Sequence, residues 1–205
     1  MDSLLKNDFT VFHKLPISNL NICQNTNSSY FELEDVDTVL TLSNTKDSGT
    51  AKYSNPNNLD MAIIDFDSFL TSLSHKFRQG KSRCDAIVYS QNKSYFFLNE
   101  LKNRKIEDEN AFSEVLSKAI SQMLKTLYLI NTVPSIITFI ESFTEKRCCY
   151  CNKQSNYPSP IINATIAFNR LNNFMPDGIE LEHLEMNVLG FKLFQYTGLQ
   201  TIKIN

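Results

Sequence analysis

The sequence contains no tryptophan and only five glycines and six prolines among its 205 residues. So few breaking residues argue against a chain rich in linkers, and the length favours one domain. No apolar stretch approaches the ~18 residues that a membrane helix requires. Residues 1–15 carry scattered charges and no apolar run, which is unlike a secretory signal. We therefore expect no membrane partner.

The sequence motifs of several enzyme classes are also missing. There is no glycine-rich phosphate loop and no G-x-S-x-G pattern of serine hydrolases. The three histidines are isolated, and none belongs to an H-E-x-x-H zinc motif. P-loop nucleotide hydrolysis, serine hydrolase chemistry of that type and zinc protease chemistry therefore have no support in this sequence.

The five cysteines are odd in number and unevenly spaced, which suits reduced thiols in the cytoplasm better than a disulfide framework. Cys148, Cys149 and Cys151 could suggest zinc, but structural zinc usually needs a second ligand pair, and none follows. On a strand, Cys149 and Cys151 would share one face and Cys148 would point to the other. We expect all three to act as small buried apolar side chains.

The net charge of −2 excludes a uniformly cationic nucleic-acid binder. Basic residues are nevertheless concentrated between Lys76 and Lys105, where only Asp85 and Glu100 are acidic. This basic island could contact phosphates, or it could be an ordinary solvated surface. Its members are Lys76, Arg78, Lys81, Arg83, Lys93, Lys102, Arg104 and Lys105.

Hydrophobic periodicity predicts an α/β domain with a mixed sheet. The most regular segment is 110–130, whose apolar residues recur at helical spacing. A shorter helix is predicted over 65–77, with Asp65 or Asp67 as its cap. Residues 135–143 could be a helix or a strand. Strands are predicted at 30–36, 38–42, 83–89, 95–102, 147–152, 165–169, 191–194 and 201–204, and loops or turns at 43–58, 90–94 and 176–178.

The two strands on either side of the polar segment 90–94 would form a hairpin. A two-residue or a four-residue turn at its centre gives the same register, which pairs positions whose numbers sum to 185. Asp85 then lies directly opposite Glu100, with the two β-carbons about 5 Å apart. Lys102 follows two residues later on the same face.

This grouping has a chemical rationale. Two carboxylates at that separation repel one another unless a cation lies between them. Hard oxygen ligands suit Mg²⁺ or Mn²⁺, which keep water molecules for a phosphate substrate. The ammonium group of Lys102 could hold or deprotonate the attacking water, or it could stabilise the charge that builds on a phosphate.

The segments Cys84–Val88 and Phe96–Lys102, followed by a long amphipathic helix, resemble the PD-(D/E)XK nuclease superfamily. Its members include restriction endonucleases, repair nucleases and phage-defence effectors. The resemblance covers roughly residues 60–130, with Cys84 in place of the family's proline. It implies an α/β, restriction-endonuclease-like core with a central mixed β-sheet flanked by helices. That core would span about 60–170 of a single domain 1–205, with elaborations at 1–59 and 171–205.

The resemblance also implies roles for individual residues. A magnesium or manganese ion would be held by two carboxylates and one backbone carbonyl, and a lysine would be catalytic. A glutamine of the following helix would lie beside the site, and the preceding helix would offer an acidic residue, for which Asp67 is the nearest candidate. The metal ligands would be Asp85, Glu100 and the carbonyl of Leu101, and the catalytic residues would be Asp85, Glu100, Lys102 and Gln122.

The expected function is that of a metal-dependent nuclease acting on DNA rather than RNA, in phage defence or restriction. Because each chain would hold one active site, cutting both strands would require a homodimer or two events, and a protein partner is also open. One alternative is a nuclease-fold module that binds nucleic acid or protein without cutting. Another is an unrelated α/β interaction protein, in which Glu100 and Lys102 form an incidental surface ion pair.

Overall fold

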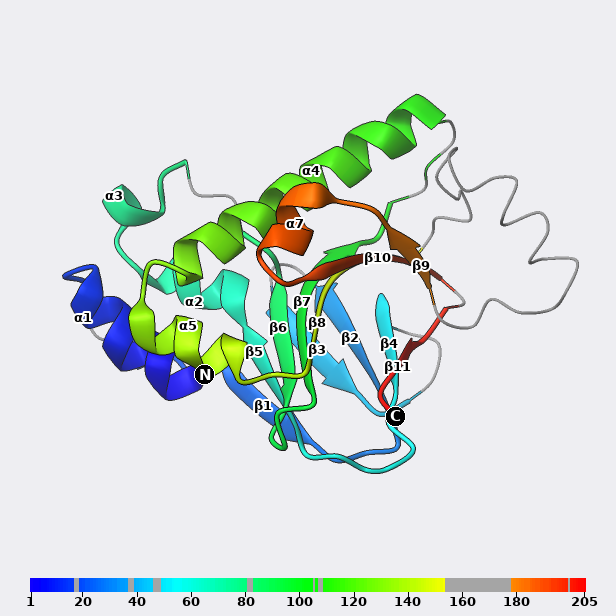
Figure 1. Cartoon of the computed structure of the whole chain (residues 1–205), viewed down its shortest axis with the longest axis horizontal. Coiled ribbons are helices and arrows are strands. Elements are labelled where there is room, and N and C mark those ends of the chain that lie inside the picture. The colour runs from blue at the N-terminus through cyan, green and yellow to red at the C-terminus, as the bar shows by residue number, and fades with distance from the viewer. Residues whose placement is uncertain are drawn as a thin grey trace, which may run out of the picture.

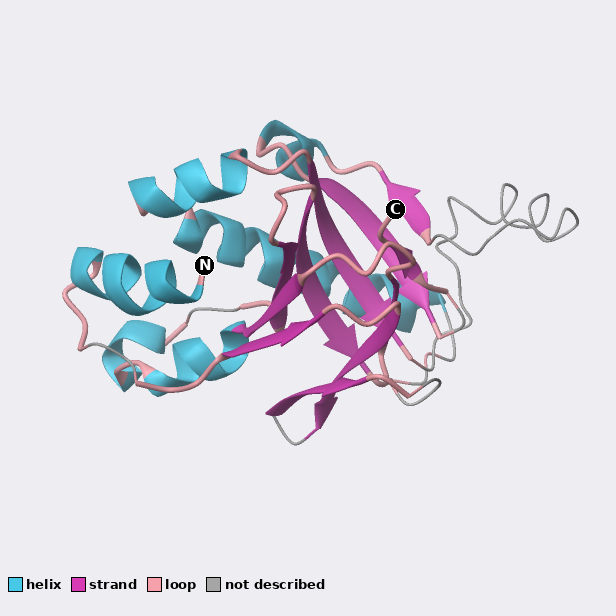
Figure 2. Cartoon of the chain, turned by 90° about the horizontal axis from the view of Figure 1, so that it is seen from below, coloured by secondary structure: helices cyan, strands magenta, loops and turns pink. Residues whose placement is uncertain are grey.

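The regular elements of the chain form three layers, a helical layer, a seven-stranded sheet and a four-stranded sheet (Figure 1). Figure 2 shows the helices gathered on one side of the strands. The predicted α/β class and mixed sheet are therefore confirmed. The computed structural model describes residues 1–16, 19–36, 39–45, 49–80, 83–104, 106, 109–153, 178–198 and 200–205.

The central sheet is mixed, and its strands are, from one edge to the other, β1 (Cys23–Thr26), β5 (Met61–Asp65), β6 (Ala86–Ser90), β7 (Tyr95–Lys102), β8 (Glu145–Asn152), β10 (Lys192–Thr197) and β9 (Ile179–Leu181). β5, β6 and β7 form an antiparallel meander. β8 pairs parallel with β7, and β10 pairs parallel with β8. Because parallel neighbours need a long crossover, α4 (Glu109–Ile130) and α5 (Pro134–Glu141) connect β7 to β8.

A second sheet covers one face of the central sheet. Its strands are, in order, β11 (Ile202–Lys203), β4 (Ala51–Ser54), β2 (Tyr30–Val36) and β3 (Val39–Ser43). The side chains between the two sheets form one apolar cluster, in which the rings of Phe31 and Tyr53 stack with centroids 4.6 Å apart. The sequence predicted a sheet flanked by helices. In the part of the chain that the structure describes, helices cover only one face.

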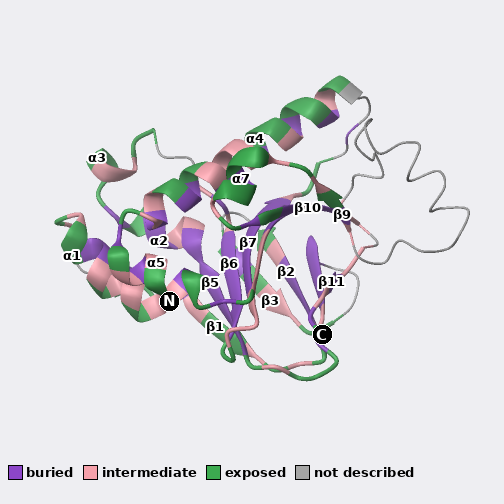
Figure 3. Cartoon of the chain, in the orientation of Figure 1, coloured by how far each residue is buried: buried purple, intermediate pink, exposed green. Residues whose placement is uncertain are grey.

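The helical layer packs on the opposite face of the central sheet. A second apolar cluster joins the helices to the sheet and includes Leu5, Phe69, Leu98 and Met123. Figure 3 shows this arrangement as buried central strands beneath helices whose outer faces are exposed. The helices are η1 (Leu4–Phe9, a π-helix), α1 (Thr10–Phe12), α2 (Phe66–Ser72), α3 (His75–Arg78), α4, α5 and α7 (Leu184–Val188).

Three helix predictions can be compared with these elements. The prediction over 110–130 is confirmed by α4. The segment 65–77 contains two helices instead of one: Asp65 caps α2 by accepting a backbone hydrogen bond, and Ser74 caps a separate α3. The undecided segment 135–143 is helical up to Glu141, and Pro134 is compatible with α5 because it occupies the first turn, where its missing N–H is harmless.

The strand predictions are partly confirmed. The predicted loop 43–58 is wrong, because it contains β4, whose backbone pairs with β2 and β11. β1, β5 and β9 were not predicted, although β5 is fully buried beside the hairpin. The predicted strand 165–169, and Pro176 and Asp177 of the predicted turn, lie outside the described residues. The predictions at 30–36, 38–42, 95–102, 147–152, 191–194 and 201–204 coincide with β2, β3, β7, β8, β10 and β11, with shifts at some ends.

The predicted burial of Cys148, Cys149 and Cys151 and their division between the two faces of the sheet are confirmed. All five cysteines are free thiols. Cys148 belongs to the helix-side cluster, whereas Cys149 and Cys151 lie in the cluster between the sheets, as strand alternation predicted. All three side chains are buried.

No single helix among the described residues is long and apolar enough to cross a membrane. α4 and α5 meet that criterion only together, as a pair bent by 116°.

Candidate active site

The β6–β7 hairpin has the predicted register. Its residue pairs run from Ala86–Asn99 to Tyr89–Phe96, so that paired numbers sum to 185. The turn is closed by the N–H of Lys93, which donates to the carbonyl of Ser90 at 3.1 Å. Lys93 adopts a positive φ of 66°, as tight turns often require. This register brings the two ends of the hairpin, near residues 85 and 100, to the same end of the sheet.

Asp85 itself departs from the expected strand geometry. The prediction placed it inside a strand over 83–89, but β6 begins at Ala86 and Asp85 forms a bend. Its N–H donates to the carbonyl of Asn99 at 3.0 Å. Its Oδ2 accepts the N–H of Leu101 at 2.6 Å. The Asp85 carboxylate therefore accepts the N–H of Leu101 in place of a backbone carbonyl of β6, where the pairing of β6 with β7 ends. This hydrogen bond joins Asp85 to the residue next to Glu100.

Glu100 is completely buried near the end of β7, which is the middle strand of the sheet. It alternates with Phe96 and Leu98, both in the helix-side cluster, so its side chain faces the helical layer. Its Oε1 forms an ion pair with Nζ of Lys102, which is one-quarter exposed. Its Oε2 is buried and has no hydrogen-bond partner among the described residues. A buried carboxylate oxygen without a partner is costly, and it calls for a physical explanation.

The ionisation of the three side chains is coupled. Burial raises the pKa of Asp85 to about 6, against the opposing effects of Lys102 and of the Leu101 N–H. Burial and the charge of Asp85 raise the pKa of Glu100 to about 8. Burial alone would lower the pKa of Lys102, but Glu100 and Asp85 outweigh it and raise that pKa. Two acids and one base therefore act on one another, as the sequence predicted.

The backbone just before Asp85 is held by α4. The N–H of Cys84 donates to Oγ1 of the buried Thr126 at 2.8 Å. The side-chain amide of Gln122 donates to the carbonyl of Arg83 at 3.0 Å. Gln122 thus lies beside the site, but its amide nitrogen contacts the segment that leads to Asp85. Thr126, one helical turn further along α4, was not predicted, and its Gln-x-x-x-Thr spacing is the only sequence signal for it.

The start of α2 holds the same segment from the other side. The backbone N–H groups of Phe66 and Asp67 donate to the carbonyl of Asp85 at 3.1 and 3.3 Å. Asp67 forms an ion pair with Arg83, and its charge also acts on Asp85 and Glu100. Asp67, the predicted acidic residue of the preceding helix, thus lies next to the site, where Arg83 offsets its charge.

The donor atoms suit a divalent cation. Asp85 and Glu100 offer carboxylate oxygens, one of them without a partner. In a strand the N–H and C=O of one residue point to the same side, so the carbonyl of Leu101 points toward Asp85 together with its N–H. These are hard oxygen donors of the kind that Mg²⁺ and Mn²⁺ prefer. Within the described ranges, no group of three or more His, Cys, Asp or Glu side chains could hold a metal ion. The candidate ligand set thus consists of two carboxylates and one carbonyl.

The basic island is divided in space. Lys93 lies at the hairpin turn, with its Nζ 3.3 Å from the ring centroid of Phe139. Lys102 and Arg104 lie at or just beyond the other end of β7. Arg83 lies beside Asp67. Arg78 donates to the carbonyl of Thr71 at 3.3 Å, and Arg83 donates to the hydroxyl of the same residue. Lys81 and Lys105 lie outside the described residues.

Comparison of the chain with protein-family models, with curated proteins and with solved structures found no match.

Proposed function

We propose that this chain is a metal-dependent nuclease of the PD-(D/E)XK type, with Asp85, Glu100 and Lys102 at its centre. The observation that carries the proposal is the buried carboxylate of Glu100, which has an unpartnered oxygen beside a second carboxylate. Further support comes from the element order. An antiparallel meander, a long helix and a parallel strand follow one another, as in the restriction-endonuclease-like core that the resemblance implies.

The metal would be Mg²⁺ or Mn²⁺, held by Asp85, Glu100 and the carbonyl of Leu101. When bound, such an ion supplies a water of lowered pKa and offsets charge on the phosphate. The hydrogen bond from the Leu101 N–H orients Asp85, and the apolar neighbours of Glu100 exclude bulk water from it. These residues would fix the position of both carboxylates before a substrate arrives.

Lys102 would act as a cation. Its raised pKa keeps it protonated at neutral pH, which favours charge stabilisation over proton abstraction. Hydrolysis forms a bond between the water oxygen and phosphorus and breaks the bond to one sugar oxygen, which gains a proton. The second proton of the water is released. The ammonium group would stabilise the negative charge that develops on the phosphate oxygens during that step.

DNA is the proposed substrate, in phage defence or restriction, and a homodimer would allow both strands to be cut. A cytoplasmic location belongs to the same proposal, and the five free thiols support it.

The test combines metal binding with cleavage. Calorimetric titration with Mn²⁺ should give one site in the wild type and none in Glu100→Gln or Asp85→Asn. Plasmid and single-stranded DNA should be cut with Mg²⁺ or Mn²⁺, not with EDTA, and not by Lys102→Ala. Lys6→Ala, on η1, is the matched lysine control and should cut like the wild type.

The second candidate is a nuclease-fold module that binds nucleic acid or a protein without cutting. The contact between Lys102 and Glu100 favours it, because it gives one oxygen of the buried carboxyl a partner without a metal. That reading predicts no Mn²⁺ binding and no cleavage, with DNA binding or protein binding retained. One Mn²⁺ site that both acid-to-amide variants abolish would contradict it.

A further inference from the structure

A small cavity lies between the end of β7 and the first half of α4. Its volume is about 170 Å³. Because four of its lining residues belong to α4, the cavity lies on the face of the sheet that the helices cover. It is lined by Arg104, Ile106, Ala111, Glu114, Val115 and Lys118.

The cavity lining is connected to the acidic site through β7 and two hydrogen bonds of β8. Arg104 follows Lys102 by two residues, and its N–H donates to Oδ1 of the buried Asn152 at 3.1 Å. The side-chain amide of Asn152 donates to the hydroxyl of Tyr150 at 3.3 Å. Tyr150 pairs directly with Glu100 across β7 and β8. Burial is the main cause of the raised pKa of Tyr150, about 12, and the charges of Glu100 and Arg104 both act on it.

The lining combines cations with an apolar wall. Arg104 and Lys118 are basic, and Ile106, Ala111 and Val115 are apolar. Glu114 pairs with Lys118, but both side chains are about two-thirds exposed, so this pair contributes little stability. A phosphate can therefore compete for Lys118 and contact Arg104, whose planar guanidinium matches phosphate oxygens. The described lining residues include no aromatic ring on which a base could stack, but their apolar side chains can contact the face of a base while the cations contact the phosphate, and a positive groove that follows the backbone is typical of single-strand binding.

We propose that this cavity binds the nucleotide next to the cleaved phosphodiester, with Arg104 contacting its phosphate. The inference rests on the proposed nuclease function and specifies whether the DNA is single-stranded or double-stranded at the active site. A base that is paired and stacked in a duplex must leave the stack before it can enter a cavity, which costs energy. The strand at the active site is therefore single-stranded, or is opened at that nucleotide.

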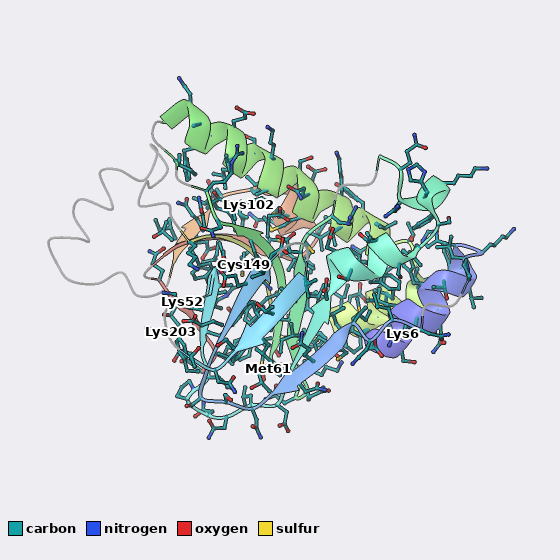
Figure 4. All side chains as sticks on the ribbon, turned by 180° about the vertical axis from the view of Figure 1, so that it is seen from behind. Lys6, Lys52, Met61, Lys102, Cys149 and Lys203 are labelled. Atoms are coloured by element: carbon teal, nitrogen blue, oxygen red, sulfur yellow. The ribbon has the colours of Figure 1, made fainter. Side chains whose placement is uncertain are left out.

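The first test measures binding without cleavage. The probe is a fluorescein-labelled DNA single strand of about 12 nucleotides, long enough for a typical single-strand site, with anisotropy recorded in EDTA over a range of salt. Arg104→Gln should bind about tenfold more weakly, with a salt slope reduced by about 0.7, as expected for one lost phosphate contact. The backbone bond of Arg104 to Asn152 does not depend on its side chain, so this variant should fold. Lys6→Gln is the charge-matched control and should bind like the wild type, because Lys6 lies far from Lys102 (Figure 4).

A second variant tests the apolar wall separately. Ala111→Phe fills the cavity without changing the charge, and it should weaken single-strand binding several-fold while leaving the salt slope unchanged. The wild type should bind the single strand more tightly than the matching duplex. Affinities of Arg104→Gln and Ala111→Phe equal to that of Lys6→Gln would overturn the cavity assignment, and so would a wild type that binds no DNA. Mn²⁺ binding reports on the acidic site alone, because it needs no DNA, so the two proposals can fail independently.

Discussion

At the scale of single residues, Glu100 is unusual because it is a fully buried acid with an oxygen unpartnered in the described part of the chain. Its carboxyl is fully buried, and one oxygen pairs with Lys102 while the other has no partner among the described residues. The burial agrees with the local sequence, because the apolar residues Tyr-Phe-Phe-Leu precede the Asn-Glu pair on one strand. The bend at Asp85 could not be predicted, because hydrogen bonds from α2 and α4 shape it, and these are distant in sequence.

The pH dependence of stability should reveal Glu100. Its pKa is 4.5 in its unperturbed form and about 8 in the folded protein. The folded state therefore holds a proton that the unfolded state releases between these values. Because Asp85, with its pKa raised to about 6, acts in the same direction below pH 6, the fall of the unfolding free energy from about pH 6 to 8 reports on Glu100. The slope should approach about 1.4 kcal/mol per pH unit. Glu100→Gln should lose most of this slope, as measured by urea denaturation in EDTA. Equal slopes in both proteins would contradict the prediction.

Mn²⁺ should stabilise the folded protein in a pH-dependent way. A cation at Asp85 and Glu100 competes with their protons, and both pKa values are raised, to about 6 and about 8. Binding should therefore strengthen as pH rises through that window. At a concentration 100 times the dissociation constant, the metal should add about 2.7 kcal/mol to the unfolding free energy. Thermal melts with Mn²⁺ at pH 6 and 8.5, followed by EDTA, measure this effect. A shift that persists in Asp85→Asn would place the metal elsewhere.

At the scale of elements, the sequence pattern predicted those helices and strands whose structure depends on contacts between residues close in sequence. The register of the β6–β7 hairpin follows from its short polar turn, and α4 follows from its regular apolar spacing. β4 and β5 were missed for a different reason. Ala-Lys-Tyr-Ser lies among Asn and Ser residues, and Met-Ala-Ile-Ile-Asp is too short to separate a strand from a helix. Both become strands through pairing with partners that the sequence does not reveal.

The contact between α4 and the segment before β6 should be energetically important. Thr126→Val keeps the shape of the side chain but leaves the N–H of Cys84 buried without its partner. We expect a loss of about 1–3 kcal/mol in the unfolding free energy. We also expect weaker Mn²⁺ binding, because the segment that leads to Asp85 becomes less fixed. Thr126→Ser retains the hydroxyl and should keep the Mn²⁺ affinity of the wild type. Equal Mn²⁺ affinity in the Val and Ser variants would show that this hydrogen bond has no role in the site.

At the scale of the whole molecule, the central sheet separates two apolar clusters, one beneath the helices and one beneath the second sheet. The active-site acids belong to the end of the sheet that α2 and α4 hold. The second sheet is connected to the same strand by a buried hydrogen bond from the hydroxyl of Tyr53 to Oδ1 of Asn99, the residue before Glu100. Both clusters therefore support the position of β7 at the site.

This connection predicts that the two sheets unfold together. Tyr53→Phe retains the ring that stacks on Phe31 but removes the hydroxyl, leaving Oδ1 of Asn99 buried without that donor. We expect a loss of about 1–3 kcal/mol, in a single transition seen alike by far-UV circular dichroism and tyrosine fluorescence. Tyr95→Phe is the matched control, because its hydroxyl bonds to Asn205 near the surface, and it should cost less than about 0.5 kcal/mol. If Tyr53→Phe produced two separate transitions, the second sheet would be an independent unit, and its contribution to the position of Glu100 would have to be abandoned.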